Sequence, residues 1–180
     1  MSFNEIALRI EANGFKREIA GENDFTAGVE AFKHMVDVAE AQTLGIIVGG
    51  EYGIGKTCYI KAVGQMLSNR PYYINLADAD DVDKLTDRWM DFWCNNLYER
   101  NVILDDIGAE EHRNDYGSII EPVTEFICNY HTRGTGRIFA TTNLCSQELV
   151  ERYGGRMFSR LKDLCIPVKF NGKDKRKWEI

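Results

Sequence analysis

The feature that most constrains the fold of this chain is the segment Gly50–Thr57, which has the spacing G-x-x-x-x-G-K-T of a P-loop. An apolar run over residues 44–48 precedes it, and a segment of helical character over residues 58–67 follows it. Glycines let the backbone bend so that successive N–H groups point inward, and the N-terminus of a following helix adds unpaired N–H groups and a positive dipole end. The segment therefore predicts a phosphate-binding turn between a strand and a helix, which is the context that this motif requires.

Each residue of this turn, together with the first residue of the helix, is expected to line a site for ATP. The expected nucleotide-binding residues are Gly50, Glu51, Tyr52, Gly53, Ile54, Gly55, Lys56, Thr57 and Cys58. Lys56 would reach the β- and γ-phosphates, and the hydroxyl of Thr57 would hold Mg²⁺. The alternative, a glycine turn with an incidental lysine, is disfavoured because the strand before the turn and the helix after it are both indicated.

A second motif, at residues 101–106, is an apolar strand that ends in two aspartates. Side chains alternate along a strand, so Asp105 and Asp106 are expected to point in different directions. We expect Asp105 to hold Mg²⁺ through water, and Asp106 to activate or orient the attacking water as a general base. Unpaired acids at the end of a buried strand are costly without a cation, which argues against a chance pair. The open alternative is that Asp106 only caps the following turn.

Two further polar positions are candidates for catalysis. Asn143 follows the expected strand at residues 137–142, at the edge where ligands of such sheets bind, and it can offer an N–H to the γ-phosphate or to the attacking water. On position alone, the alternative that Asn143 starts a turn has equal weight. Arg156 and Arg160 lie one helical turn apart, which usually indicates a solvated helix face, although arginine is also the residue that arginine fingers use.

The composition narrows the class of protein. The chain has 180 residues, enough for one domain with a full core, and its net charge of −6 argues against a surface that binds polyanions generally. Its five cysteines are scattered, with no C-x-x-C pair, as expected for reduced thiols in the cytoplasm rather than for disulfides or zinc. Neither a signal peptide nor a membrane partner is expected, because no apolar run approaches the roughly 18 residues of a membrane span.

Apolar runs and helical periodicity alternate along the chain. Helices are expected at residues 4–13, 27–41, 58–69, 78–98, 119–131, 146–153 and 156–164. Strands are expected at residues 44–48, 71–76, 101–106, 137–142 and 166–170, with a polar loop at residues 109–116. This alternation is typical of an α/β protein whose parallel sheet is buried on both faces.

Taken together, these motifs resemble the AAA+ ATPases of the bacterial replicative-helicase loaders, the DnaC-like proteins, and the related IstB-like transposition helpers. The matching runs are residues 50–57, 104–110, 141–144 and 152–161. The resemblance implies a P-loop NTPase (AAA+) fold, a three-layer sandwich with a five-stranded parallel sheet of order 5-1-4-3-2 and no C-terminal lid domain. The parts of the chain would be a short N-terminal extension at residues 1–26, an AAA+ ATPase core at residues 27–171 and a basic tail at residues 172–180.

The same resemblance implies a Mg²⁺-dependent ATPase of DNA replication that acts on single-stranded DNA and a replicative helicase, or on a transposase in the IstB-like alternative. It makes Asn143 a sensor of the γ-phosphate, and Arg160 an arginine finger that acts in trans, so self-association is expected. Asn75, at the end of the second strand, falls where some AAA+ proteins place a polar residue that restrains the catalytic acid. The segment before the core leaves room for a short helix instead of the separate helicase-binding domain of the loaders.

Functions from other classes stay open at this level. One is a P-loop small-molecule kinase, although no arginine-rich lid segment is visible between the later strands. Another is a nucleotide-dependent adaptor with negligible hydrolysis. Single-stranded nucleic acid could stack on Trp89 and Trp93, but their helical spacing favours core packing. Basic residues and a tryptophan at residues 169–178 suit single-stranded nucleic acid and a solvated terminus equally well.

Overall fold

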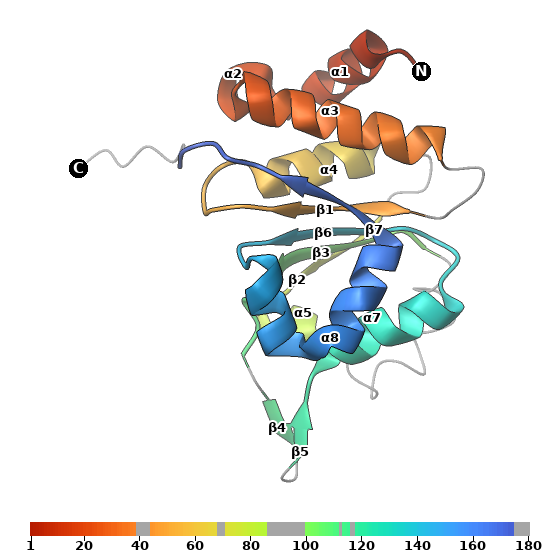
Figure 1. The fold of residues 1–180 in the computed structure, drawn as a ribbon, viewed down its shortest axis with the longest axis vertical. Helices are drawn as coiled ribbons and strands as arrows, with labels where there is room; N and C mark the ends of the chain where they lie inside the picture. The colour runs from red at the N-terminus through yellow and green to blue at the C-terminus, as the bar shows by residue number, and fades with distance from the viewer. Residues whose placement is uncertain (39–43, 68–70, 86–99, 112, 116–117, 175–180) are drawn as a thin grey trace.

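The structure is a computed structural model that describes the chain apart from residues 39–43, 68–70, 86–99, 112, 116–117 and 175–180. The helices are α1 (Phe3–Ala12), α2 (Arg17–Ala20), α3 (Glu22–Asp37), α4 (Lys56–Met66), α5 (Ala79–Asp83), α7 (Pro122–Arg133) and α8 (Ser146–Leu164). The strands are β1 (Gly45–Gly49), β2 (Tyr72–Asn75), β3 (Val102–Ile107), β4 (Arg113–Asp115), β5 (Ser118–Ile120), β6 (Ile138–Thr142) and β7 (Cys165–Lys169). Figure 1 shows three layers, in which the sheet separates α1–α4 from α5, α7 and α8.

The central sheet has the strand order β2-β3-β6-β1-β7, and every neighbouring pair in it is parallel. Numbered along the chain, these five strands give the order 2-3-4-1-5, which is the predicted order 5-1-4-3-2 viewed from the other side. The α/β class and the strand order are therefore confirmed. Because β6 lies between β1 and β3, the P-loop after β1 and the acids of β3 meet at one edge of the sheet.

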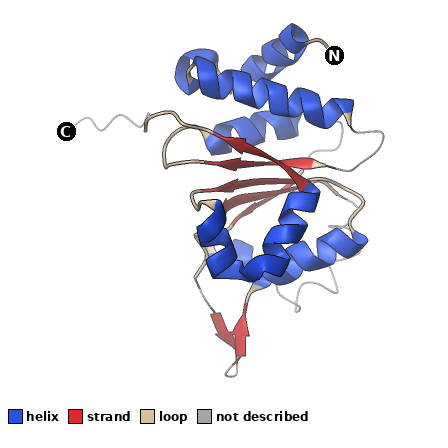
Figure 2. Ribbon diagram, in the orientation of Figure 1, coloured by secondary structure: helices blue, strands red, loops and turns tan. Residues whose placement is uncertain are grey.

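Each face of the sheet carries its own apolar core. Within β1, Ile46 and Val48 pack into the cluster formed with α1, α3 and α4, whereas Ile47 packs into the cluster formed with α5, α7 and α8. Both directions of the strand pleat are buried, so the strand needs apolar residues at every position. Figure 2 shows helices on both sides of the sheet, which explains why β1 reads as a continuous apolar run.

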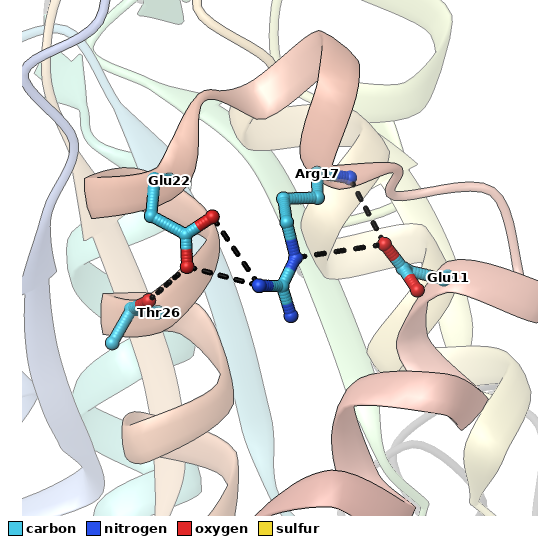
Figure 3. A network of polar contacts seen from close by, with 4 residues as sticks. All are labelled: Glu11, Arg17, Glu22 and Thr26. Atoms are coloured by element: carbon cyan, nitrogen blue, oxygen red, sulfur yellow. Dashed lines mark hydrogen bonds and ion pairs between the residues drawn. The ribbon is translucent and has the colours of Figure 1, made fainter.

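The N-terminal helices depart from the sequence prediction. The loop expected before residue 27 contains α2, and α3 begins at Glu22, so the predicted boundary between residues 26 and 27 falls inside a helix. Gly21, with a φ of 84°, marks the turn between α2 and α3. Arg17 joins the three helices, because its guanidinium lies 3.9 Å from Glu11 and 3.0 Å from Glu22 (Figure 3). These ion pairs are exposed, so the buried apolar face of α1 contributes more to stability than they do.

Two elements on the other side of the sheet also differ in detail. Part of the polar loop predicted at residues 109–116 forms β4, which pairs with β5 in an antiparallel hairpin that projects beyond the layers (Figure 2). The hairpin strands pair with each other and not with the central sheet, and each is too short to show periodicity. α7 begins at Pro122 rather than at residue 119, since proline is favoured in a first helical turn, where its missing N–H costs nothing. Gly154, with a φ of 79°, kinks α8 between the two helices that the sequence predicts there.

Some expectations fall outside the described residues. Of the helix predicted at residues 78–98, the structure describes the first part, as α5. Trp89, Trp93 and the tail after Asp174 lie outside the described residues. Among the described residues, no helix is both long enough and apolar enough to cross a membrane.

Candidate nucleotide-binding site

The glycine-rich loop predicted to bind phosphate connects β1 to α4 at the carboxyl edge of the sheet. Its three glycines, Gly50, Gly53 and Gly55, have φ values of 142°, 71° and 99°, which residues with a Cβ rarely adopt. At Gly50 there is also no space, since a Cβ would lie 2.5 Å from the carbonyl oxygen of Phe170. α4 begins at Lys56, directly after Gly55, so the unpaired N–H groups of its first turn lie at the end of the loop.

Lys56 is held inside this loop. Its side chain is buried, and Nζ donates to the carbonyl oxygens of Gly50 at 2.8 Å and Glu51 at 2.6 Å. A further bond of 2.6 Å joins Nζ to Oδ1 of Asn143, directly after β6. A buried ammonium needs such partners to offset its lost hydration, and here they hold the cation where the loop and β6 meet.

The turn after β6 is closed by a residue other than Asn143. The hydroxyl of Thr142 donates to the carbonyl oxygen of Ile107 at 2.8 Å and accepts from the backbone N–H of Leu144 at 3.1 Å. Thr142 therefore shapes this turn, and the side chain of Asn143 lies between Lys56 and the acids of β3.

Asp105 lies near the end of β3 and is only 3% exposed. Its Oδ1 accepts from the hydroxyls of Thr57 at 3.0 Å and Thr141 at 2.6 Å, and its Oδ2 accepts from the hydroxyl of Tyr73 at 2.5 Å. Burial, together with the hydrogen bond to Asp105, raises the pKa of Tyr73, so the phenol stays protonated and donates. One carboxylate thus joins α4, β6 and β2 at a single point.

Asp106 is turned away from Asp105 by an irregularity in β3. Its φ of 62° is the only positive φ of a non-glycine residue in the described part of the chain, and aspartate is among the few residues that tolerate it. The pairing of β3 with β6 shifts register between Leu104 and Ile107, and the N–H of Asp106 donates to the hydroxyl of Thr141 at 2.8 Å. The two acids therefore face different partners, as alternation along a strand predicts.

The electrostatic surroundings of Asp106 make its carboxylate more basic. Burial and the neighbouring charge of Asp105 raise its pKa, while Lys56 and a 3.3 Å hydrogen bond from Nδ2 of Asn143 oppose that change. A general base benefits from a raised pKa, provided that it is ionised at the working pH. Lys56, Asn143 and Asp106 thus form one hydrogen-bonded chain across the sheet edge.

Several solved structures have a similar fold. They include DnaI, with 19% identity and a TM-score of 0.63 over 93% of this chain and 100% of that chain, and a DnaC helicase loader, with 18% identity and a TM-score of 0.60 over 82% and 90%. The chain has the P-loop NTPase (AAA+) fold. AMPPCP-bound DnaA from Aquifex aeolicus shares this AAA+ fold, with 18% identity and a TM-score of 0.55 over 82% of this chain and 47% of that chain. No family model and no curated protein matches the sequence.

The AAA+ fold implies a magnesium ion, and the donor groups present suit one. Mg²⁺ prefers hard oxygen ligands and is usually held by one or two protein groups, substrate phosphates and water. The hydroxyl of Thr57 and the carboxylate of Asp105 supply such oxygens beside the loop, 3.0 Å apart. In the described residues no cluster of three or more histidine, cysteine, aspartate or glutamate side chains offers a different kind of metal site.

Within one copy of the protein, the fold does not bring Arg160 to the glycine-rich loop or to the acids of β3. It lies on α8, across the sheet from α4, and its Nη1 donates to the carbonyl oxygen of Cys128 in α7 at 3.3 Å. Arg156 and Arg160 both line a cleft of about 340 Å³ between α7 and α8. Within this copy, Arg160 therefore contributes to an outer face of the protein.

Sequence reasoning missed three polar residues that support the site. Tyr73 and Thr141 hold Asp105, and strand alternation gave a signal for Tyr73, which lies two residues before Asn75 on the same face of β2. Asn75, which the resemblance implies could restrain the catalytic acid, lies opposite Asp105 in the pairing of β2 with β3, and its amide oxygen accepts from the N–H of Ala77 at 3.2 Å.

Glu110 is the third missed residue. It is buried just after β3, and its carboxylate accepts from the N–H of Gly108 at 3.0 Å and from the hydroxyl of Tyr153 in α8. Arg152 of α8 donates to its carbonyl oxygen and lies 3.7 Å from its carboxylate. The run at residues 104–110 contains Glu110, but no sequence signal pairs it with α8. Through Glu110, the strand end that carries the acids is tied to the helix that carries Arg160.

Proposed function

We propose that this protein binds Mg²⁺–ATP at the P-loop and hydrolyses it, as an AAA+ ATPase of the helicase-loader type. The observation that carries the proposal is the hydrogen-bonded chain from Lys56 through Asn143 to Asp106, which lies beside the pair formed by Thr57 and Asp105. A phosphate-binding cation, a polar sensor, a basic carboxylate and two metal-binding oxygens are the groups that phosphoryl transfer to water requires.

Each group would have a separate task in the reaction. The loop N–H groups and Lys56 hold the phosphates, and Asn143 contacts the γ-phosphate or the attacking water. The oxygen of that water bonds to the γ-phosphorus while the bond to the β-phosphate oxygen breaks, and its proton passes to the carboxylate of Asp106. The products are ADP and inorganic phosphate. Magnesium, held by Thr57 and Asp105, would neutralise charge on the phosphate oxygens.

Hydrolysis between subunits is a further part of the proposal. Arg160 bonds to α7 on the opposite side of the sheet from α4, so it is free of the P-loop of its own copy and available to a neighbouring one. A guanidinium is permanently charged and stabilises charge on transferring phosphate, worth about 10³- to 10⁵-fold in rate where it has been measured.

The partners are proposed from the structural neighbours. A DnaC structure is described as a helicase loader, so a replicative helicase and single-stranded DNA are the first partners to test, with a transposase as the alternative. The described cysteines, Cys58, Cys128, Cys145 and Cys165, are free thiols, which suits the reducing cytoplasm. Pull-down with ATP against a helicase and a transposase distinguishes the two kinds of partner.

The test of hydrolysis is turnover measured against protein concentration. If sites are shared, the rate at low concentration rises with the square of the concentration, and Arg160→Ala removes that dependence. A strictly linear rate that Arg160→Ala leaves unchanged rejects the role in trans. Saturable binding of labelled ATP with no turnover, and a partner interaction that survives Asp106→Asn, supports the nucleotide-dependent adaptor instead.

A further inference from the structure

Tyr73 reaches the acid of the neighbouring strand across the face of the sheet that α4 covers. In the pairing of β2 with β3, Tyr73 lies opposite Ile103, and Asp105 is two residues further along β3 on the same face. Asp105 is thus a diagonal neighbour of Tyr73 on this face, and a side chain as long as tyrosine can reach it. The phenol of Tyr73 spans this gap and donates to Oδ2 of Asp105 at 2.5 Å.

The ring of Tyr73 is itself held by α4. Nζ of Lys61 lies 4.4 Å from the ring centroid, a favourable contact between a cation and an aromatic face. Lys61 follows Thr57 by one helical turn, so the two side chains project from the same side of α4. One helix face therefore provides the hydroxyl that bonds Oδ1 of Asp105 and the cation that packs on the ring bonding Oδ2.

We propose that Tyr73 is a positioning residue for magnesium, which fixes the carboxylate of Asp105 with Oδ1 toward Thr57 and thereby sets the affinity of the site for the metal. The inference rests on the proposed Mg²⁺–ATP site, and it adds a residue of β2 that lies outside both sequence motifs, residues 50–57 and 101–106. A carboxylate bonded at both oxygens is held in one orientation. Removing a residue that hydrogen-bonds to a metal ligand typically weakens metal binding by about 10- to 100-fold.

Replacing Tyr73 with phenylalanine isolates the hydroxyl. The change removes one oxygen from a half-buried ring, and leaves Oδ2 of Asp105 without its donor. Tyr72→Phe is the matched control, because Tyr72 neighbours Tyr73 on β2 but packs toward the core on the other face of the sheet. Circular dichroism of the three proteins checks that each is folded.

The measurement is binding of Mn²⁺ to the ATP complex, followed by electron paramagnetic resonance, with Mn²⁺ as the probe. Binding of labelled ATP in EDTA is measured alongside. We expect Tyr73→Phe to weaken Mn²⁺ binding by about 10-fold or more, as is typical when a hydrogen bond to a metal ligand is removed. Metal-free ATP binding should stay within about twofold of wild type, because the hydroxyl of Tyr73 bonds to Asp105, which is assigned to the metal and not to the phosphates. Tyr72→Phe should match wild type in both assays.

Three outcomes separate the inference from the proposal beneath it. Wild-type affinity for Mn²⁺ in folded Tyr73→Phe overturns the positioning role and leaves the ATP site standing. Equal weakening in Tyr72→Phe also overturns it, since the effect would then belong to the strand and not to the hydroxyl. Absence of nucleotide-dependent Mn²⁺ binding in the wild-type protein overturns the Mg²⁺–ATP site itself.

Discussion

The carboxylate of Asp24 accepts a hydrogen bond of 2.8 Å from the backbone N–H of Asn171, although the two residues are 147 positions apart in the sequence. The second oxygen of Asp24 accepts the N–H of Gly172, also at 2.8 Å. Asp24 belongs to α3 and is 3% exposed, so a buried anion at the edge of the N-terminal layer holds the segment after β7. That segment runs along the P-loop, where a Cβ built on Gly53 would lie 1.8 Å from Oδ1 of Asp174.

Asp24→Ala should detach this segment. Hydrogen bonds to a charged group contribute about 1.5–3 kcal/mol each, and the detached N–H groups can turn to water, so we expect a loss of about 2 kcal/mol in the free energy of unfolding. Urea denaturation measures the loss, and trypsin should cleave the tail faster. Glu30→Ala, which removes an exposed carboxylate from the same helix, is the control and should change neither. Equal proteolysis of the two variants would contradict an anchoring role.

Asp106→Asn should stabilise the protein at neutral pH. The pKa of Asp106 is raised in the folded state, so ionisation of this group disfavours folding. The cost grows as the pH rises from the ordinary aspartate pKa to the raised value, is complete above the raised value, and is absent below both. Asparagine also tolerates the positive φ of this position. Thermal unfolding from pH 4 to pH 8 should show a gain that grows with pH.

Asp81 provides a control of opposite sign. Burial alone would raise its pKa, but hydrogen bonds from Lys84 and from the N–H of Asn75 outweigh burial and lower it. Its stabilising contribution is therefore present above the ordinary aspartate pKa and is lost as the pH falls through the lowered value. Asp81→Asn should destabilise the protein at neutral pH, and the same direction of change in both variants would refute this interpretation of the two acids.

The rate of ATP hydrolysis should fall on the acidic side of a pKa above that of an ordinary aspartate. Asp106 accepts a proton only when it is ionised, and its raised pKa moves the acidic limb of the kcat profile to higher pH. Asn143→Ala removes a hydrogen bond that lowers this pKa, so its residual activity should show a limb displaced further upward. A kcat profile of the wild-type protein whose acidic limb lies at or below the ordinary aspartate pKa would contradict this role for Asp106.

Glu110→Ala should be among the most destabilising single changes on the α8 side of the sheet. It removes the acceptor of the Tyr153 hydroxyl and the carboxylate that lies 3.7 Å from Nη2 of Arg152, although the hydrogen bond from Arg152 to the carbonyl oxygen of residue 110 can remain. Nε of Arg152 already has no hydrogen-bond partner among the described residues. Breaking a buried pair by removing one member costs about 3–5 kcal/mol. Chemical denaturation gives the value. Glu111→Ala, an exposed neighbour, should cost less than about 0.5 kcal/mol.

Mixing two inactive variants tests the arginine finger. Lys56→Ala has an intact Arg160 but a defective phosphate site, whereas Arg160→Ala has an intact site but no finger. If Arg160 acts in trans, each variant alone should lose about 10³-fold in rate and the mixture should recover part of the activity. Arg156→Ala, which removes the other arginine of the same cleft, serves as the comparison. Failure of the mixture to recover, with ATP binding intact in Arg160→Ala, would place the finger elsewhere.

Much of this structure follows from local patterns. The glycine spacing at Gly50–Thr57 requires a strand–turn–helix unit, and the apolar run into Asp105 requires a buried strand. The elements that the sequence analysis missed depend on contacts between residues distant in the chain, or are strands too short to show a pattern. The start of α3 at Glu22 depends on packing against α1 and on Gly21, and the β4–β5 hairpin is too short to show a periodic pattern.

Local patterns in the sequence were enough to predict the glycine-rich loop, the alternation of strands and helices, and the positions of the acids, because each depends on residues close together in the chain. Tertiary structure decided which side chains meet. Tyr73 contacts Asp105 because β2 and β3 are paired in one register, and Asp24 holds Asn171 because α3 lies beside the end of β7. Register and helix docking are set by burial summed over the whole core, so no local pattern of residues carries that information.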